Sequence, residues 1–247
     1  MNKRPLDNIF FDINKLPVSE GIILFGISMS RIGNAQSAKK CFEYLKHLAS
    51  KIQHTDGIGM VVLYGDYLYF NSNDPAYTLR DKFKSLMVSH KNAFLNLLKK
   101  DRKWTHKAFS FTTFGQLLLD NSDTYQYVYN TVLDLYKNDP VFRKYVEEDG
   151  KDAGHGVGER EAIFILEEIT LFYLSQKGVF RLSNRFVTDA EKTWTLQAYP
   201  GGYLKSEVYL FRKNPLGLSN PKNQYEHYFY DLDKKLLYDY DRINLDA

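Results

Sequence analysis

Several features of secreted, membrane-bound and zinc-binding proteins are missing from this chain of 247 residues. Its single cysteine, Cys41, excludes a disulfide framework and a cysteine-based zinc site. No run of about 18 uncharged apolar residues occurs, so no membrane-spanning helix is expected. The first segment, MNKRPLDNIFFDINKLP, has no continuous apolar core and carries Asp7 and Asp12, unlike a secretory signal peptide. We therefore expect a cytoplasmic protein in which Cys41 packs on a helix.

The usual nucleotide- and phosphate-binding loops are absent as well. The chain contains neither Gly-x-Gly-x-x-Gly nor Gly-x-x-x-x-Gly-Lys-Ser/Thr, the motifs whose backbones cradle phosphates. It has no internal repeat and no low-complexity linker, and its 44% hydrophobic and 26% charged residues are those of an ordinary globular protein. These properties predict one domain over residues 1–247, long enough for a substantial core.

Two kinds of apolar segment alternate along the chain. Short continuous runs predict buried strands at 21–27, 59–64 and 108–114, and amphipathic periodicity predicts helices at 35–51, 76–103, 125–136, 140–148 and 159–175. Further strands are predicted around 179–180, 186–187, 194–196 and 207–212. Strands that alternate with helices indicate an α/β domain with a mainly parallel sheet flanked by helices. Ligands bind beyond the carboxyl ends of such strands, which places the candidate site at 26–30 and 64–66.

The first predicted strand ends in a glycine followed by two serines, in the segment IILFGISMSRIGN. A glycine just past a strand, here Gly26, lets a ligand lie close to the backbone. Residues 26–30 are similar to the nucleophile elbow Gly-x-Ser-x-Gly, but the last glycine is replaced by Ser30. A serine hydrolase also needs a histidine base, and His155, in a glycine-rich loop, has only a weak context for that role. Taken alone, Ser28 is best interpreted as a turn serine.

Positive charge is concentrated in one predicted helix. Between residues 82 and 107 seven lysines and one arginine accompany only one acid, Asp101, whereas the whole chain carries a net charge of only +3. Helical spacing places an apolar row that includes Phe83 and Phe94 on the face opposite the basic residues. A solvated helix face is the alternative, but so dense a positive row suits a nucleic-acid phosphate backbone. The basic residues assigned to this surface are Lys84, Lys91, Lys99, Lys100, Arg102 and Lys103.

A carboxylate on a partly apolar helix is the third feature. In the predicted helix 159–175, Glu168 follows Phe164 by four residues and so shares its face with Leu171 and Phe172. An unpaired carboxylate on such a face is costly. Glu168 is therefore either peripheral and solvated, as we expect for Glu167, or held in place to bind an amine or move a proton.

Together these segments resemble the tRNA-dependent cyclodipeptide synthases, and the resemblance covers most of the chain in the same order. FGISMS is similar to that family's strand-end Gly-Val/Ile-Ser, whose serine is the nucleophile. NAFLNLLKKDRK is similar to its basic tRNA-binding helix, and FILEEITLFYLSQKGVF to its Tyr-x-x-x-Glu helix. LQAYPGG is similar to the Tyr-Pro pair that marks one of the family's two branches. The His-Ile-Gly-His and Lys-Met-Ser-Lys-Ser motifs of class I aminoacyl-tRNA synthetases are absent.

The resemblance implies a Rossmann-like domain, similar to class I aminoacyl-tRNA synthetase catalytic domains, that makes a cyclic dipeptide from two aminoacyl-tRNAs by a ping-pong mechanism. It implies that Ser28 attacks the first aminoacyl ester, that Glu168 binds the α-amino group, and that Tyr199 with Glu168 moves protons during ring closure. A second aminoacyl-tRNA accepts the dipeptidyl group. No metal and no cofactor are implied, and a monomer is expected. The residues implied to contact the substrate are Gly26, Arg31, Phe164 and Pro200.

The chain departs from the family pattern in three places. Phe164 stands where the family usually has tyrosine, Arg31 stands where the Tyr-His branch has asparagine, and the segment 178–199 is longer than expected. Two other classes of protein also remain open. A non-catalytic tRNA- or RNA-binding protein would use the same basic helix, and a serine hydrolase would need a histidine near Ser28. The sequence leaves open which amino acids are joined.

Overall fold

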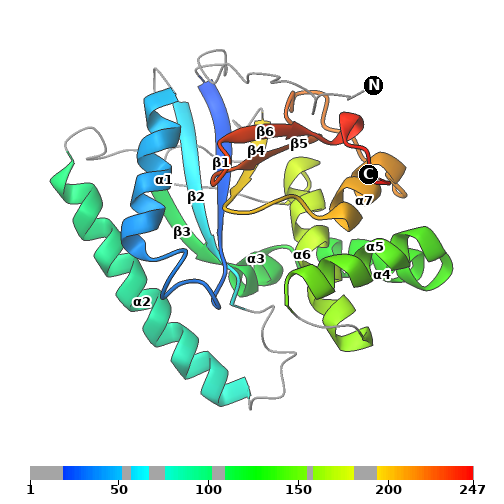
Figure 1. Ribbon diagram of the computed structural model, residues 1–247, viewed down its shortest axis with the longest axis horizontal. Coiled ribbons are helices and arrows are strands. Elements are labelled where there is room, and N and C mark those ends of the chain that lie inside the picture. The colour runs from blue at the N-terminus through cyan, green and yellow to red at the C-terminus, as the bar shows by residue number, and fades with distance from the viewer. Residues whose placement is uncertain are drawn as a thin grey trace.

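The core of the computed structural model, which describes residues 19–51, 57–66, 76–101, 109–154, 158–180 and 194–246, is a six-stranded sheet (Figure 1). The strands are β1 (Ser19–Ile27), β2 (Gly57–Tyr64), β3 (Phe109–Thr113), β4 (Trp194–Tyr199), β5 (Tyr228–Asp231) and β6 (Leu236–Asp239). They lie in the order β3-β2-β1-β4-β5-β6. Only the β5–β6 pair is antiparallel among these described strands, which confirms the predicted mainly parallel sheet.

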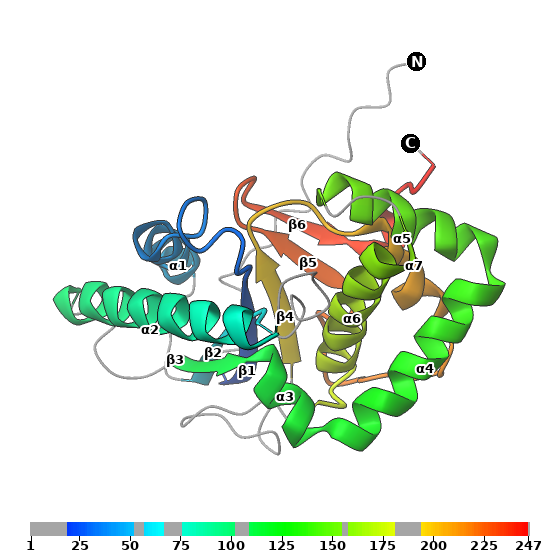
Figure 2. The ribbon, with the colours of Figure 1, turned by 90° about the horizontal axis from the view of Figure 1, so that it is seen from below.

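Helices cover both faces of the sheet (Figures 1 and 2). One face carries α1 (Ala38–Lys51) and α2 (Ala76–Lys100), and the other carries α4 (Ser122–Asn138), α5 (Pro140–Asp152), α6 (Glu159–Gln176) and α7 (Lys205–Lys213). A short helix, α3 (Phe114–Asp120), follows β3, and the 3-10 turn η4 (Tyr240–Arg242) follows β6. Cys41 packs on α1 as predicted, and burial raises the pKa of its thiol to about 12. In the described part of the chain, no helix combines the length and apolarity that crossing a membrane requires.

The two helix layers explain why β1 is apolar without interruption. Ile22 and Leu24 belong to the core beneath α4–α7, and Ile23 and Phe25 belong to the core beneath α1 and α2. All four side chains are fully buried, because a parallel strand covered on both faces has no solvent-facing side. The chain leaves β1 towards β2 and β3 on one side and later returns to β4 on the other. This change of direction creates a switch point at the carboxyl ends of β1 and β4, where α/β sheets bind ligands.

One predicted strand is a helix. The segment 207–212 lies within α7, and the prediction of a strand there is wrong. Its short apolar run is compatible with either structure, because period and length are not diagnostic over so few residues. Asn214 ends the helix with a left-handed φ of 44°, and Pro215 follows it. This pair is a helix-stop signal that the sequence does contain.

The remaining differences concern short elements. The hairpin of β5 and β6 and the helix α3 were not predicted, and residues 179–180 follow α6 without forming a strand. The predicted strand at 186–187 lies outside the described residues. The predicted strand at 194–196 is confirmed and extends to Tyr199.

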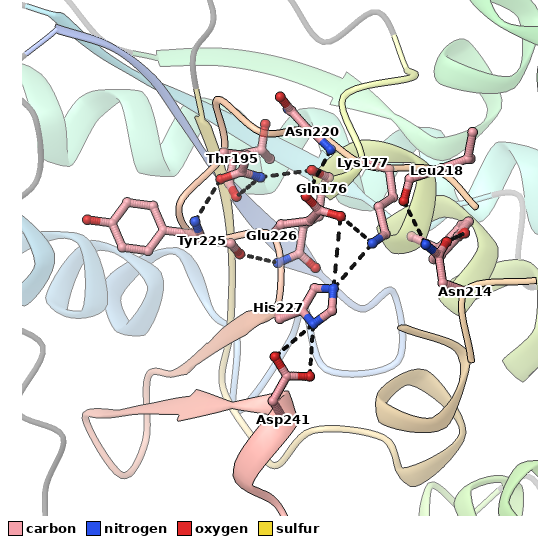
Figure 3. Close-up of polar contacts among 12 residues, drawn as sticks. Gln176, Lys177, Thr195, Asn214, Leu218, Asn220, Tyr225, Glu226, His227 and Asp241 are labelled. Atoms are coloured by element: carbon pink, nitrogen blue, oxygen red, sulfur yellow. Dashed lines mark hydrogen bonds and ion pairs between the residues drawn. The ribbon is translucent and has the colours of Figure 1, made fainter. Parts of the chain in front are cut away.

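A polar network fastens the end of α6 to the chain that enters β5 (Figure 3). The Lys177 ammonium, whose side chain is only 1% exposed, pairs with the Glu226 carboxylate and lies 3.3 Å from His227 Nε2. On its other side, His227 Nδ1 lies 3.0 Å from the Asp241 carboxylate. Removing one partner of a buried ion pair is strongly destabilising, so this network holds α6 against the sheet.

Gly21 offers a test of the packing between β1 and β4. It lies opposite Trp194, and a Cβ added at Gly21 would come within 1.8 Å of Trp194 Cε2. Gly21→Ala should therefore lower the free energy of unfolding by about 1–3 kcal/mol, because the buried indole must move. Urea unfolding measures this loss. The matched control is Gly33→Ala, where an added Cβ meets no atom within 4 Å, and equal stability of the two variants would contradict the packing described here.

Candidate active site

A cavity of about 340 Å³ opens at the carboxyl ends of β1 and β4. Its walls come from the end of β1, α5, α6, β4, the 201–204 loop and α7. The loop between β1 and α1, residues 28–37, also contributes and is called the serine loop below. Six of the residues singled out in the sequence line it together: Gly26, Ser28, Arg31, Phe164, Glu168 and Tyr199. Residues separated by up to 173 positions in the chain (26 to 199) thus meet in one place.

The serine loop is held by a buried side chain that sequence reasoning missed. Gln36, fully buried, accepts a hydrogen bond from the Ser28 backbone N–H at 2.8 Å and donates one to the Gly26 carbonyl at 2.8 Å. These two bonds fix the backbone on both sides of Ile27. The Ser28 hydroxyl oxygen lies 2.9 Å from the Ser30 hydroxyl oxygen, so the two serines form a pair at the cavity wall.

His90 connects the same loop to the basic helix α2. Its Nε2 lies 3.0 Å from the backbone carbonyl oxygen of Gln36, and its Nδ1 lies 2.9 Å from the Tyr64 hydroxyl. Burial lowers the pKa of His90, so the ring is neutral and has a single N–H. Because a carbonyl can only accept, Nε2–H donates to Gln36 and Nδ1 accepts from Tyr64. The position of α2 is therefore coupled to the position of the loop.

Tyr199 packs directly against Gly26. The β1–β4 register pairs Phe25 with Ala198, so Tyr199 comes next to Gly26, where a Cβ would lie 3.2 Å from the tyrosine ring. The Arg31 guanidinium lies 5.7 Å from the centre of that ring and donates from Nη1 to the Pro200 carbonyl at 3.1 Å. Arg31 and Tyr199 thus line one edge of the cavity together, whereas Pro200, which binds Arg31 through its carbonyl, is not among the lining residues.

Glu168 lies in the cavity wall on α6, partly buried, one turn after the half-buried Phe164. Burial raises the pKa of its carboxyl to about 7, although the nearby charge of Arg31 acts in the opposite direction. The expectation that Glu167 is solvated is wrong, because Glu167 is only 9% exposed. The helix α6 is covered by its neighbours on more than one side, which the sequence periodicity alone did not indicate.

Three further polar residues in the cavity were not predicted as site residues. Asp149, on α5, accepts hydrogen bonds from the backbone N–H groups of Lys205 and Ser206 at 3.0 and 2.7 Å, and so caps the start of α7. Glu207, on α7, is 1% exposed, and burial raises the pKa of its carboxyl to about 8. Gln197, on β4, is 3% exposed. Their segments are far apart in sequence, so no local pattern marked them.

The predicted basic surface lies on α2, on the face of the sheet opposite α4–α7 (Figure 2). Lys84, Lys91, Lys99 and Lys100 are exposed there, and the Lys91 ammonium lies 5.0 Å from the centre of the Phe111 ring. Arg102 and Lys103 lie outside the described residues. Within the described ranges, no group of three or more histidine, cysteine, aspartate or glutamate side chains is arranged to hold a metal ion.

Comparison with known proteins gives a likeness of fold. No protein-family model matches the chain, and no curated protein matches it. A CDPS from Staphylococcus haemolyticus matches with a TM-score of 0.55 and 14% identity, over 83% of this chain and 87% of that one. A cyclodipeptide synthase from Bacillus thermoamylovorans matches with a TM-score of 0.54 and 15% identity, over 84% and 91%.

A third similar structure is that of a Mycobacterium tuberculosis protein, described as demonstrating that cyclodipeptide synthetases are related to type I tRNA synthetases. It matches with a TM-score of 0.53 and 13% identity, over 83% of each chain. The chain therefore has the mixed α/β fold of these proteins, with a mostly parallel sheet flanked by helices. The predicted fold class is confirmed.

The buried carboxyls make the stability of the fold depend on pH. The pKa of Glu207 rises from an ordinary 4.5 to about 8 in the folded chain, so the unfolded chain binds fewer protons between these values. The free energy of unfolding should therefore fall as pH rises from about 5 to about 8, by on the order of 1 kcal/mol per pH unit. Glu207→Gln should flatten this slope. Urea unfolding across that range measures it, with the exposed Glu43→Gln as control; an unchanged slope in Glu207→Gln would contradict the assignment.

Proposed function

We propose that the chain is a tRNA-dependent cyclodipeptide synthase, an aminoacyltransferase that joins two aminoacyl groups from tRNA into a diketopiperazine. The observation that carries this proposal is the cavity shared by Gly26, Ser28, Glu168 and Tyr199, in a fold similar to that of cyclodipeptide synthases. The order of the matching motifs along the chain supports the same function. Tyr199–Pro200 favours the Tyr-Pro branch, and we assign one domain to residues 1–247.

In this proposal Ser28 is the nucleophile. Its Oγ attacks the ester carbonyl of a first aminoacyl-tRNA, an ester to Ser28 forms, and the tRNA hydroxyl leaves with the serine proton. Ser30, whose oxygen is 2.9 Å away, can accept the hydrogen bond of the Ser28 hydroxyl and so orient it. The leaving hydroxyl is itself the proton acceptor, so the step needs no histidine base.

Glu168 then holds the α-ammonium group of the acyl-enzyme. Burial raises the pKa of the Glu168 carboxyl to about 7, and the opposite charge of the ammonium lowers it again, which favours the ionised carboxylate. A second aminoacyl-tRNA supplies the other aminoacyl group. Tyr199, beside Gly26, works with Glu168 to move protons while the ring closes and the cyclic dipeptide leaves. Aminoacyl-tRNAs are the only partners that this scheme requires, and the setting is cytoplasmic.

Two other functions would use part of this architecture. A non-catalytic RNA-binding protein would use the exposed lysines of α2 but would not need Ser28. A serine hydrolase would need a histidine beside Ser28, and the described residues that line the cavity include none. Mass spectrometry of the culture medium after expression in a bacterium separates these functions, because only the synthase releases cyclic dipeptides.

The nucleophile can be tested directly. Ser28→Ala should reduce cyclic dipeptide formation by roughly 10³-fold or more, because the covalent route is lost. Labelled aminoacyl-tRNA should mark the wild-type protein covalently and leave Ser28→Ala unmarked. Ser30→Ala removes only the neighbouring hydroxyl and should still form the covalent adduct. Normal turnover by Ser28→Ala would contradict the proposed mechanism.

The basic helix can be tested by charge reversal. Lys99→Glu with Lys100→Glu should weaken tRNA binding and flatten its dependence on salt concentration, because fewer counterions are released on binding. Stability should change little, since both side chains are exposed. The matched control reverses the exposed Lys137 and Lys222, which lie away from α2. If affinity and salt slope are unchanged in the α2 variant, tRNA binds another surface.

A further inference from the structure

The cavity holds more acid than the proposed chemistry uses. Its lining includes the carboxyl groups of Asp149, Asp152, Glu168 and Glu207, and Arg31 is the one cation among the described residues that line it. In the proposed chemistry Glu168 binds the α-ammonium of the substrate, and Asp149 caps the start of α7. Asp152 is exposed at the end of α5. Glu207 is buried and has no part in that chemistry.

Neutral groups hold the Glu207 carboxyl. The Tyr240 hydroxyl, fully buried, donates to Glu207 Oε1 at 2.8 Å, and the Gln197 amide, a further N–H donor, also favours the ionised carboxylate. Neither donor carries a charge, so neither compensates the negative charge of the ionised group. The nearby carboxyls of Glu168 and Asp149 disfavour that charge further. A cation that enters the cavity would relieve both effects.

Gln197 provides a second and independent indication of a ligand. Its side chain lines the cavity, and its Oε1 is buried without a hydrogen-bond partner. An amide oxygen can only accept a hydrogen bond, so Oε1 needs an N–H or O–H donor. A buried acceptor without a donor is costly, and most such atoms in folded proteins are satisfied. An N–H donor on a bound molecule would satisfy this one.

The rest of the lining suits an aliphatic stem. The lining also includes apolar side chains, among them Phe114, Phe164, Leu171, Phe172 and Phe229. The methylene groups of a long basic side chain pack against such walls while its charged end reaches polar groups. The volume of about 340 Å³ is that of a small-ligand pocket.

We propose that this cavity selects an aminoacyl group with a cationic side chain, arginyl or lysyl, whose N–H groups bind the Glu207 carboxylate and Gln197 Oε1. This inference rests on the proposed function, since it names the substrate class of the same site. The α-ammonium binds Glu168, and the side chain extends along the apolar walls towards α7 and β4. An apolar side chain in the same place would leave Gln197 Oε1 without a donor and Glu207 without a counter-ion.

Binding of amino-acid amides tests the selectivity without any catalysis. The probes are arginine amide, lysine amide and norleucine amide, which share the α-amino group and differ only in the side chain. Calorimetry at one fixed pH should give arginine amide or lysine amide an affinity about 10- to 100-fold higher than that of norleucine amide, as expected for charged hydrogen bonds. Equal or weaker binding of both basic amides would overturn the inference.

Two variants identify the residues responsible. Glu207→Gln keeps an oxygen acceptor for Tyr240 but removes the charge, so the preference for basic amides should disappear while norleucine amide binds as before. Gln197→Leu should reduce the preference in part. Glu43→Gln, on the far face of the sheet, should keep it in full. A preference that survives Glu207→Gln in a folded protein would overturn the assignment.

Product analysis separates a failure of this inference from a failure of the proposed function. The protein is supplied with tRNA charged with all twenty amino acids, and cyclic dipeptides are identified by mass spectrometry. Products that contain arginine or lysine support both proposals. Products with only uncharged residues support the synthase and overturn the basic specificity. Selective binding of basic amides without any product contradicts the synthase while the cation site stands.

Discussion

The burial of β1 between β2 and β4 is the constraint on which the site depends. Helices cover both faces of the strand, so its apolar run cannot shift by one residue without exchanging the two cores. This fixed register determines where β1 ends, and therefore where Gly26 and the serine loop leave the sheet. At that point the chain connections diverge to the two sides of β1, which leaves the crevice that becomes the cavity.

A single buried side-chain amide, that of Gln36, fixes the position of Ser28 at the end of β1. Gln36 binds the backbone on both sides of Ile27, and its own carbonyl accepts a hydrogen bond from His90 of α2. A hydrogen bond thus connects the helix that carries the exposed lysines to the serine loop. In the proposed synthase, the helix that positions the tRNA phosphates also supports the residue that attacks the ester. Buried polar networks of this kind are costly when broken and specify one geometry when complete.

The cavity keeps its carboxyls at some expense to stability. Glu168 and Glu207 come from neighbouring helices, and burial raises the pKa of both groups. The fold offsets this with neutral donors such as Tyr240 and with the proximity of Arg31 to Glu168. An apolar core at the same positions would avoid the desolvation, so the retention of buried acid is typical of a binding site rather than of packing.

Local pattern alone determined the elements whose signal is contained in their own residues. The apolar run of β1, the periodicity of α2 and the four-residue spacing of Phe164 and Glu168 each predicted the observed structure, because burial on one or both faces leaves its period in the sequence. The motifs also identified six of the residues that line the cavity. Short segments without a period, such as α7, were predicted less well.

Only the tertiary structure decided which distant groups meet. The start of α7 is capped by Asp149 of α5, so the signal that begins this helix lies more than fifty residues before it. Gln197 and Glu207 become a polar pair only because β4 and α7 adjoin the same cavity. Nothing in the sequence around Gln36 marks it, and only the fold brings its side chain into hydrogen-bonding distance of the Ser28 backbone. Hydrogen bonds and charges act through space, and their partners are chosen by packing rather than by position along the chain.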